Sequence, residues 1–242
     1  PEGFELPVKP FLHQQQAIAF CMNLPKAALW LDLGLGKTYT SIAIARLRHF
    51  KQQVRNVIIL APRSLLKQWG DEIKAFTPKD ESYSVHLCIG TPKKKAQVID
   101  EYLKMRHKPN HLAYLVCTYE SIGSYAESIY LSTDMFILDE ATKIKNPSAI
   151  RTKNTVELCK AIKYGLELTG LAYLNDPRDL FGQILAVDAT VYGTNLWEFG
   201  NDYLKFTKMG AKSIPIGVKN IKELKSRAYY VAFSRKKQDC LD

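Results

Sequence analysis

The chain has 242 residues, of which 46% are hydrophobic and 24% are charged. This length allows one large α/β domain or two small ones, and the hydrophobic content is sufficient for a buried core. A formal net charge of +10 favours a polyanionic partner, and nucleic acid is the commonest class of such partners. No apolar run reaches the roughly 18 residues that a transmembrane helix requires.

Five cysteines are scattered along the chain without a Cys-x-x-Cys pair. An odd number without paired spacing predicts reduced thiols in an intracellular protein, cytoplasmic or nuclear, and not a disulfide framework or a zinc site. No signal peptide is visible, and we expect no membrane partner. The cysteines are Cys21, Cys88, Cys117, Cys159 and Cys240.

Apolar runs and stretches of helical spacing alternate along residues 10–168. This alternation predicts an α/β fold with a mainly parallel sheet and helices on both of its faces. The predicted helices are 10–23, 39–50, 63–76, 92–105 and 148–162. The predicted strands are 27–31, 56–61, 83–89, 112–117, 135–138 and 164–168.

From residue 176 onward the pattern is helical. Helical stretches are predicted at 180–187, 196–206 and 221–228, with a Gly- and Pro-containing loop at 210–217. No linker divides the chain, so we expect one domain over 1–242 with 176–242 as its helical extension. Because the chain starts at Pro1 without an initiator Met, we expect a piece of a longer protein.

The first predicted strand leads directly into a glycine-rich stretch, 34–36, which is followed by Lys37 and Thr38. The two glycines allow a tight turn whose N–H groups point at a phosphate, while the lysine supplies charge and the threonine a hydroxyl for Mg²⁺. Leu31 stands where the full G-x-x-x-x-G-K-[ST] pattern has its first glycine. The alternative is an ordinary glycine-rich turn before an amphipathic helix.

Two adjacent carboxylates, Asp139 and Glu140, follow the apolar strand at 135–138. Such a pair at the end of a buried strand is costly unless it is solvated, hydrogen-bonded or faces a cation. In an ATPase the first carboxylate would hold Mg²⁺ through water and the second would orient or deprotonate the attacking water. The alternative is an exposed acidic turn that ends a strand.

Several further stretches, in the same order, resemble the first motor lobe of the Swi/Snf-type DNA-dependent ATPases of helicase superfamily two. One resembles the adenine-reading glutamine motif, two resemble DNA-facing motifs, one resembles the acidic box followed by Ile-Lys-Asn, and one with its downstream residues resembles the coupling motif. The resemblance covers nearly the whole chain. These stretches are Leu12-His13-Gln14, APRSLLKQW at 61–69, TYES at 118–121, DEATKIKNPSA at 139–149, and ELTG at 167–170 with Asn175 and 179–181.

The resemblance implies a RecA-like lobe that binds ATP and Mg²⁺ and is a DNA-dependent ATPase. It also implies tracking on double-stranded DNA when a second RecA-like lobe, absent from this chain, is joined to it. That lobe supplies arginine fingers in the family, so we expect residues 1–242 alone to bind ATP weakly and to hydrolyse it poorly.

The resemblance also assigns roles to individual residues. It implies catalytic roles for Lys37, Asp139 and Glu140, and Mg²⁺ ligands in Thr38 and Asp139. Nucleotide contacts would come from Gln14, Gly34, Leu35, Gly36, Lys37, Thr38 and Tyr39. DNA contacts would come from Arg63, Ser64, Lys67, Tyr119, Ser121, Lys145 and Asn146, each with the alternative of a solvated surface position.

Other positions are expected to be structural, or depart from the family. Trp69 suits burial better than contact with phosphate, and Lys93 to Lys95 suit a solvated helix face. The family usually has His at the position of Thr142 and Thr-Pro at that of Leu171-Ala172, so these changes affect coupling more than ATP binding.

Two alternative functions remain open. One is a catalytically attenuated DNA-binding module. The other is a strand-separating helicase or a restriction translocase with the same catalytic set. The sequence Ile-Lys-Asn at 144–146 favours a Swi/Snf-type motor over these alternatives.

Overall fold

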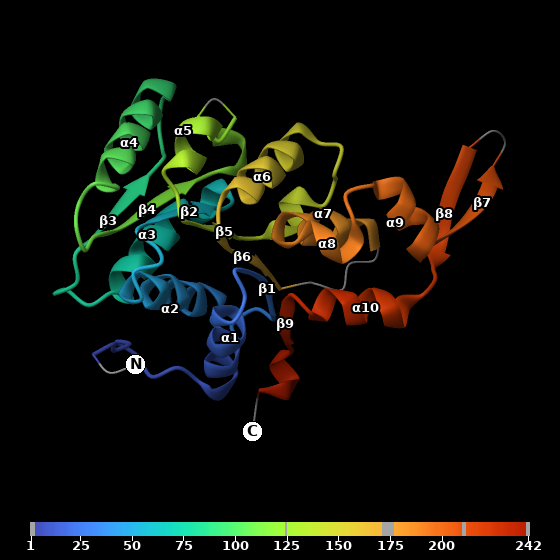
Figure 1. Ribbon diagram of the computed structural model, residues 1–242, viewed down its shortest axis with the longest axis horizontal. Coiled ribbons are helices and arrows are strands. Elements are labelled where there is room, and N and C mark those ends of the chain that lie inside the picture. Colours follow the sequence, from blue (N-terminus) through green and yellow to red (C-terminus); the bar gives the residue numbers. More distant parts are fainter. Residues whose placement is uncertain (1–2, 124, 171–176, 210–211, 241–242) are drawn as a thin grey trace.

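The computed structural model describes residues 3–123, 125–170, 177–209 and 212–240, and seven strands form one sheet (Figure 1). These strands are β1 (Lys26–Leu31), β2 (Asn56–Leu60), β3 (Tyr83–Leu87), β4 (Leu112–Cys117), β5 (Met135–Leu138), β6 (Tyr164–Thr169) and β9 (Ala232–Arg235). They lie in the order β3-β4-β2-β5-β6-β1-β9, and every neighbouring pair is parallel. The predicted parallel α/β architecture is therefore confirmed.

Helices cover both faces of this sheet (Figure 1). Because successive side chains of a strand point to opposite faces, a strand covered on both sides is apolar throughout. In β2, Val57 and Ile59 belong to one buried cluster, and Ile58 and Leu60 to the other. The first cluster includes side chains of α1 (Leu12–Met22), α2 (Lys37–Phe50) and α3 (Leu66–Ala75). The second includes side chains of α4 (Pro92–Met105), α5 (Ala126–Leu131) and α6 (Ile150–Ala161).

The C-terminal part of the chain forms a third apolar cluster against β1. Trp30 packs there among side chains of four C-terminal helices. Within this cluster the Phe199 ring contacts the rings of Phe181, Tyr192 and Tyr203. The helices are α7 (Pro177–Val187), α8 (Ala189–Tyr192), α9 (Leu196–Tyr203) and α10 (Ile221–Tyr229).

Two expectations for this region are wrong. The helix predicted over 196–206 ends at Tyr203, and β7 (Leu204–Met209) follows it. The loop predicted over 210–217 is largely occupied by β8 (Lys212–Val218), which pairs antiparallel with β7 and projects from the body (Figure 1). Ile214, Ile216 and Val218 alternate as in a strand, but Pro215 and Gly217 between them favour a loop when only the sequence is considered. The edge strand β9 and the short helices α5 and α8 were also not predicted.

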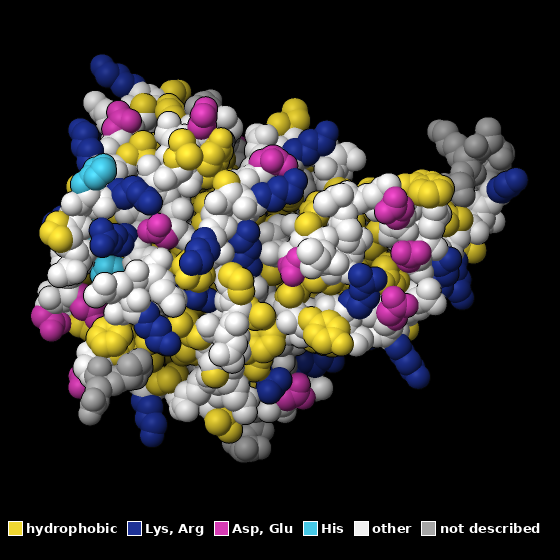
Figure 2. Space-filling model, viewed as in Figure 1, with side chains coloured by type: hydrophobic (Ala, Val, Ile, Leu, Met, Phe, Trp, Pro, Cys, Tyr) yellow, Lys and Arg dark blue, Asp and Glu magenta, His cyan; other side chains and the backbone are white. Residues whose placement is uncertain are grey.

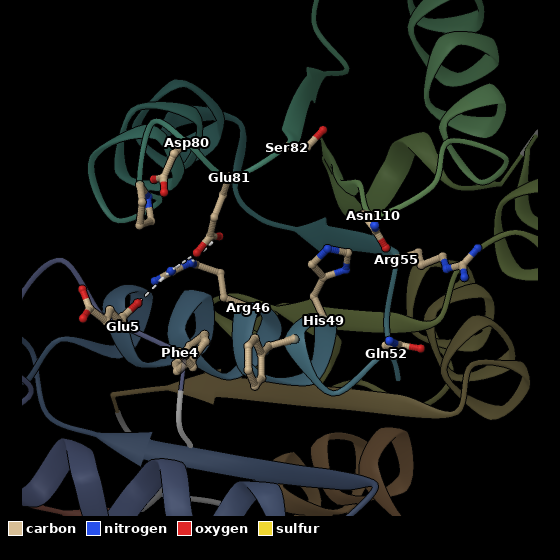
Figure 3. Close-up of a pocket in the computed structure, with 13 residues that line it drawn as sticks. Phe4, Glu5, Arg46, His49, Gln52, Arg55, Asp80, Glu81, Ser82 and Asn110 are labelled. Carbon is tan, nitrogen blue, oxygen red and sulfur yellow. Dashed lines mark hydrogen bonds and ion pairs between the residues drawn. The ribbon is translucent and has the colours of Figure 1, made fainter.

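The segment before α1 is held against α2 by Arg46, whose side chain is 1% exposed (Figure 3). Its guanidinium donates to the Glu81 carboxylate, with 3.0 Å between Nε and Oε2, and to the Glu5 carbonyl at 2.9 Å. The Phe4 ring lies 5.2 Å from the guanidinium carbon. These residues line a cavity of about 580 Å³ beside the amino ends of β2, β3 and β4.

Candidate functional site

The chemistry-bearing residues meet at the carboxyl edge of the sheet. In a parallel sheet all strands end at one edge, and ligands bind there. The glycine-rich loop follows β1, the acidic pair follows β5, Arg63 follows β2 and Thr118 follows β4. The order of the strands places β5 and β6 between β2 and β1, which brings these loops together.

The glycine-rich loop has the geometry of an anion cradle. Gly34 and Gly36 have φ angles of +86° and +77°, a region that favours glycine. A Cβ atom added to Gly36 would lie 2.3 Å from Nε2 of Gln14, so no larger residue fits without rearrangement. Helix α2 begins at Lys37, directly after this turn, so the N–H groups of its first turn and the positive pole of its dipole face the loop.

Lys37 lies folded over the loop. Its Nζ donates to the Leu31 carbonyl at 2.7 Å and approaches the Asp32 carbonyl at 3.4 Å. Burial lowers the pKa of the Lys37 ammonium, and the charges of Glu140 and Asp139 act in the opposite direction. The lysine therefore carries its charge between the loop and the acidic pair, bonded to main-chain carbonyls.

The carboxylate of Asp139 is 8% exposed and accepts two hydrogen bonds. Oδ2 accepts from the indole Nε1 of Trp69 at 2.8 Å, and Oδ1 accepts from the main-chain N–H of Glu140 at 2.9 Å. Burial raises the pKa of Asp139, and the Trp69 hydrogen bond opposes that rise. Trp69 is buried as expected, but its contact with Asp139 was missed; the need of a buried indole N–H for a partner is the signal that points to such a contact.

Glu140 has a left-handed backbone, with φ of +50° and ψ of +55°. A non-glycine residue in this region costs free energy, and such residues cluster at functional sites. The side chain is half-buried. Thr142, which stands where the family has His, lies in the following 3₁₀ turn, and its Oγ1 is 3.5 Å from the Glu140 carbonyl.

These groups line one cavity of about 430 Å³, which we call the loop cavity. Its volume is within the range of small-molecule sites. A carboxylate and a hydroxyl in one cavity are the oxygen ligands that Mg²⁺ prefers, so the residues fit this ion. Of the predicted site residues, it contains Gly34, Gly36, Lys37, Thr38, Tyr39, Asp139 and Glu140. The sequence did not predict its other wall, formed by Leu65, Gln68, Trp69, Glu72 and Phe76.

Two predicted nucleotide contacts, Gln14 and Leu35, are not among the residues that line the loop cavity. Both side chains are buried. The Gln14 amide donates to the Leu35 carbonyl at 3.3 Å and accepts from the N–H of Phe11 at 3.0 Å. His13 Nε2 lies 3.1 Å from the same Leu35 carbonyl. Helix α1 therefore contacts the loop at the main chain of Leu35.

A second cavity of about 510 Å³, which we call the basic groove, lies between α3 and the end of β4. The predicted DNA-facing residues Arg63, Ser64, Lys67 and Ser121 line it. Lys95, expected on a solvated face, also lines it and donates to Ser121 Oγ at 3.2 Å. The charges of Lys and Arg are spread widely over the face seen in Figure 2, so net charge alone does not locate this groove.

The other predicted DNA-facing residues lie outside the basic groove. Tyr119 is 3% exposed, and its hydroxyl donates to the Asp139 carbonyl at 2.8 Å, so the expectation of a phosphate contact through this hydroxyl is corrected. Lys145 and Asn146 are exposed on the segment before α6. Arg151 of α6 donates to Glu120, a groove residue, at 2.8 Å.

Some sequence expectations concern other features of the chain. Leu171, Ala172 and Asn175 lie outside the described residues, as does the side chain of Asp179. All five cysteines are free thiols. In the described part of the chain, no cluster of three or more His, Cys, Asp or Glu could hold a metal ion, and no helix is long and apolar enough to cross a membrane.

Comparison with known proteins identifies the family. The SNF2-related domain model matches residues 13–221. The chain is 25% identical over 195 residues to a SWI/SNF-related matrix-associated actin-dependent regulator of chromatin subfamily A-like protein 1 of Xenopus tropicalis, covering 80% of this chain and 19% of that protein. It is 30% identical over 200 residues to the DNA excision repair protein ERCC-6-like of Mus musculus, covering 78% of this chain and 16% of that protein.

Among solved structures, the SWI2/SNF2 ATPase core of Sulfolobus solfataricus in complex with dsDNA superposes with a TM-score of 0.71 at 21% identity. The match covers 99% of this chain and 47% of that one. The chain thus spans less than a fifth of the two curated relatives and about half of the solved structure. Because the family model matches far more than half of the residues, the chain belongs to the SNF2-related domain family, with the fold of a RecA-like Swi/Snf motor lobe.

Proposed function

We propose that this chain is the first, ATP-binding lobe of a Swi/Snf-type motor that hydrolyses ATP to move along double-stranded DNA. The observation that carries this proposal is that Lys37, Thr38, Asp139 and Glu140 line one cavity, immediately beside a groove that carries three cationic side chains. The same helix, α3, contributes to both cavities.

The loop cavity would hold the nucleotide by its phosphates. Main-chain N–H groups at the start of α2 and the Lys37 ammonium would bind phosphate oxygens, and Thr38 and Asp139 would hold Mg²⁺. The metal ion supplies charge neutralisation at the phosphates when it is bound. Glu140 would orient the attacking water and accept its proton.

Residues behind and beside the loop would complete the nucleotide site. Tyr39 lines the cavity and packs edge-on against Phe76, with 5.0 Å between ring centroids, which forms an apolar wall. Gln14 would contact adenine after its amide exchanges the Leu35 carbonyl for the base edge. Leu35 would act through the loop backbone, because its side chain is buried.

The basic groove would receive a DNA strand. Arg63, Ser64, Lys67 and Ser121 offer charge and hydroxyl groups to phosphates, which position a duplex without reading its sequence. Lys145 and Asn146 would extend this surface beyond the groove. The solved relative from Sulfolobus solfataricus was obtained with double-stranded DNA, which supports the choice of partner.

We further propose that residues 1–242 form one lobe, with 176–242 as its extension, and that a second lobe completes the motor. Arginines contributed across an interface to the nucleotide raise hydrolysis by about 10³ or more in other NTPases. Residues 1–242 alone would therefore hydrolyse ATP slowly. The curated relatives are several times longer, which leaves room for such a lobe.

The test is ATP hydrolysis by the longest natural chain, with and without duplex DNA, beside Lys37→Ala and Glu140→Gln. We expect DNA-stimulated turnover in the unmodified chain and background turnover in both variants. Glu140→Gln should still bind ATP, because the change removes the base but not the phosphate contacts.

A different result would identify another function. Turnover at background in the unmodified chain, with DNA binding retained, would overturn the enzyme proposal and support an attenuated DNA-binding module. That module is the second candidate because Thr142 cannot carry the charge of the usual imidazole.

A further inference from the structure

Helix α3, together with the 3₁₀ turn Arg63–Leu65 that precedes it, is a shared wall between the two cavities. Leu66 and Lys67 line the basic groove, while Gln68 and Trp69 line the loop cavity. A helix is rigid over such a short distance, because its backbone hydrogen bonds fix successive residues. A shift of the groove side of α3 therefore also moves its cavity side.

Trp69 connects this wall directly to the acidic pair. Its side chain is 2% exposed, and its only N–H group in the indole donates to Asp139 Oδ2 at 2.8 Å. The carboxylate is itself buried, so it has few other partners with which to replace this donor. The position of α3 thus fixes the orientation of the Asp139 side chain.

Tyr119 makes a second connection from the opposite wall of the groove. It lies in the 3₁₀ turn Tyr119–Ser121, whose Ser121 lines the groove and bonds Lys95 and Thr118. The Tyr119 hydroxyl donates to the main-chain carbonyl of Asp139 at 2.8 Å. Each wall of the groove therefore contributes one hydrogen bond to Asp139: Trp69 bonds its carboxylate and Tyr119 bonds its main-chain carbonyl.

The central strands cannot shift relative to Asp139 in the way that α3 and the Tyr119 turn can. Asp139 is held on β2 by the bond between its N–H and the Leu60 carbonyl, at 2.8 Å, inside the parallel sheet. Segments joined to a rigid sheet through side-chain hydrogen bonds can move relative to it, whereas neighbouring central strands cannot without breaking the ladder.

We propose that Trp69 and Tyr119 are positioning residues that link the two cavities, so that duplex DNA in the basic groove and Mg-nucleotide in the loop cavity change each other's affinity through Asp139. The inference rests on the proposed function, since it takes duplex DNA and Mg-nucleotide as the two ligands. Linkage is reciprocal, so either ligand reports on it.

The experiment measures the dissociation constant of a fluorescent non-hydrolysable ATP analogue with Mg²⁺, in the longest natural chain, with and without a saturating 30-base-pair duplex. The variants are Trp69→Phe, Tyr119→Phe and the double variant, which remove the donors and keep the rings. Tyr102→Phe is the matched control, because that buried hydroxyl bonds Thr133 at 2.9 Å, outside both cavities.

We expect the duplex to tighten analogue binding by about tenfold in the unmodified chain and in Tyr102→Phe, within the usual range of coupling factors. Each single variant should reduce this factor to about threefold, and the double variant should bring it close to one. Trp69 itself lines the loop cavity, so the readout is the ratio of affinities with and without DNA within each protein and not the affinity without DNA. A tenfold factor that survives in the folded double variant would overturn the proposal.

The outcomes separate this inference from the proposed function. If the unmodified chain binds neither the analogue nor the duplex, the proposed function fails. If it binds both but its coupling factor is one, or is unaffected by the variants, only the linkage fails.

A second measurement needs no variant. Of the three tryptophans in residues 1–242, only Trp69 lines the loop cavity, so the ¹⁹F signal of Trp69 in 5-fluorotryptophan-labelled protein should respond to Mg-nucleotide. That same signal should respond to duplex DNA alone. A signal that is insensitive to DNA at saturation would overturn the proposal even if the variants do not fold.

Discussion

The two edges of the sheet hold cationic side chains in different ways: Arg46 is buried, whereas Lys37 is half-buried. At the amino edge, Arg46 bonds Glu81 and the Glu5 carbonyl and lies over the Phe4 ring (Figure 3). It also donates to the Phe76 carbonyl at 3.3 Å. At the carboxyl edge, Lys37 bonds only main-chain carbonyls of its own loop among the described residues. A cation that is paired with a carboxylate stabilises the fold. A cation whose hydrogen bonds go only to main-chain carbonyls can exchange those acceptors for the oxygens of a ligand.

The largest expected effect tests the carboxyl edge. Lys37→Met should weaken binding of an Mg-ATP analogue on the order of 10²- to 10³-fold, because the variant loses a charge-assisted contact to phosphate. Its free energy of unfolding should change by less than about 0.5 kcal/mol, since burial already disfavours the charged form of Lys37. Titration calorimetry and urea unfolding measure the two quantities. A large loss of stability would place Lys37 in the same class as Arg46.

Arg46→Ala should show the opposite pattern. Removing a buried cation that binds three segments should lower the free energy of unfolding by about 2–4 kcal/mol. Below the new melting temperature, affinity for the nucleotide analogue should stay within about twofold, because Arg46 lies beside the amino ends of the strands. Thermal unfolding and analogue binding on the same sample test the contrast. Loss of nucleotide affinity in fully folded protein would contradict it.

A buried carboxylate between the two edges adds a pH dependence. Glu167 is fully buried; Oε2 accepts from the Trp30 indole at 2.9 Å, whereas Oε1 has no hydrogen-bond partner in the described part of the chain. Burial raises the pKa of Glu167 to about 8, the Trp30 bond opposes the rise and the charge of Glu140 adds to it. The folded chain therefore keeps a proton that the unfolded chain releases above a pH of about 4.5.

Stability should consequently fall as the pH rises through this interval. The contribution of Glu167 decreases by at most about 1.4 kcal/mol per pH unit between pH 5 and 8. Glu167→Gln keeps the size and the hydrogen-bond acceptor but removes the titration. Urea unfolding at pH 5.5 and 8 should show a smaller pH dependence in the variant, and equal pH dependence in both proteins would refute the assignment.

The smallest effect concerns the basic groove. Lys67→Ala should weaken duplex binding by about two- to fivefold and reduce the slope of log K against log salt by about 0.9, the value for one phosphate contact. Lys74→Ala is the control, since Lys74 is exposed on the same helix but does not line the groove. Equal slopes for the two variants would show that the groove does not contact phosphate.

The sequence predicted the central sheet well because its strands are short apolar runs bounded by turn residues. The bounds of β4 and β5 and of helix α4 are confirmed to the residue. Strands buried on both faces carry this signal in every residue. The hairpin β7–β8 carries no such signal, because most of its described side chains are exposed, and its strands were mistaken for helix and loop.

The site was predicted in its loop and acidic pair, but not in its walls. Local sequence identifies Gly36-Lys37 and Asp139-Glu140, because turn chemistry and charge at a strand end are local properties. The partners of Trp69 and Tyr119 depend on how α3 packs on the sheet and on the strand order that brings the turn after β4 near the end of β5, which no local pattern encodes. The burial of Tyr119 is such a tertiary property, and this explains why its expected surface position was wrong.

The short strand β9 has a consequence for the solution behaviour of the protein. It pairs with β1 from Ala28 to Leu31 and forms one edge of the sheet. A version shortened to end before residue 232 would leave β1, a run of buried apolar residues, as an unprotected edge with free N–H and C=O groups. Such edges pair with strands of other molecules, so the four residues of β9 should reduce aggregation of the lobe.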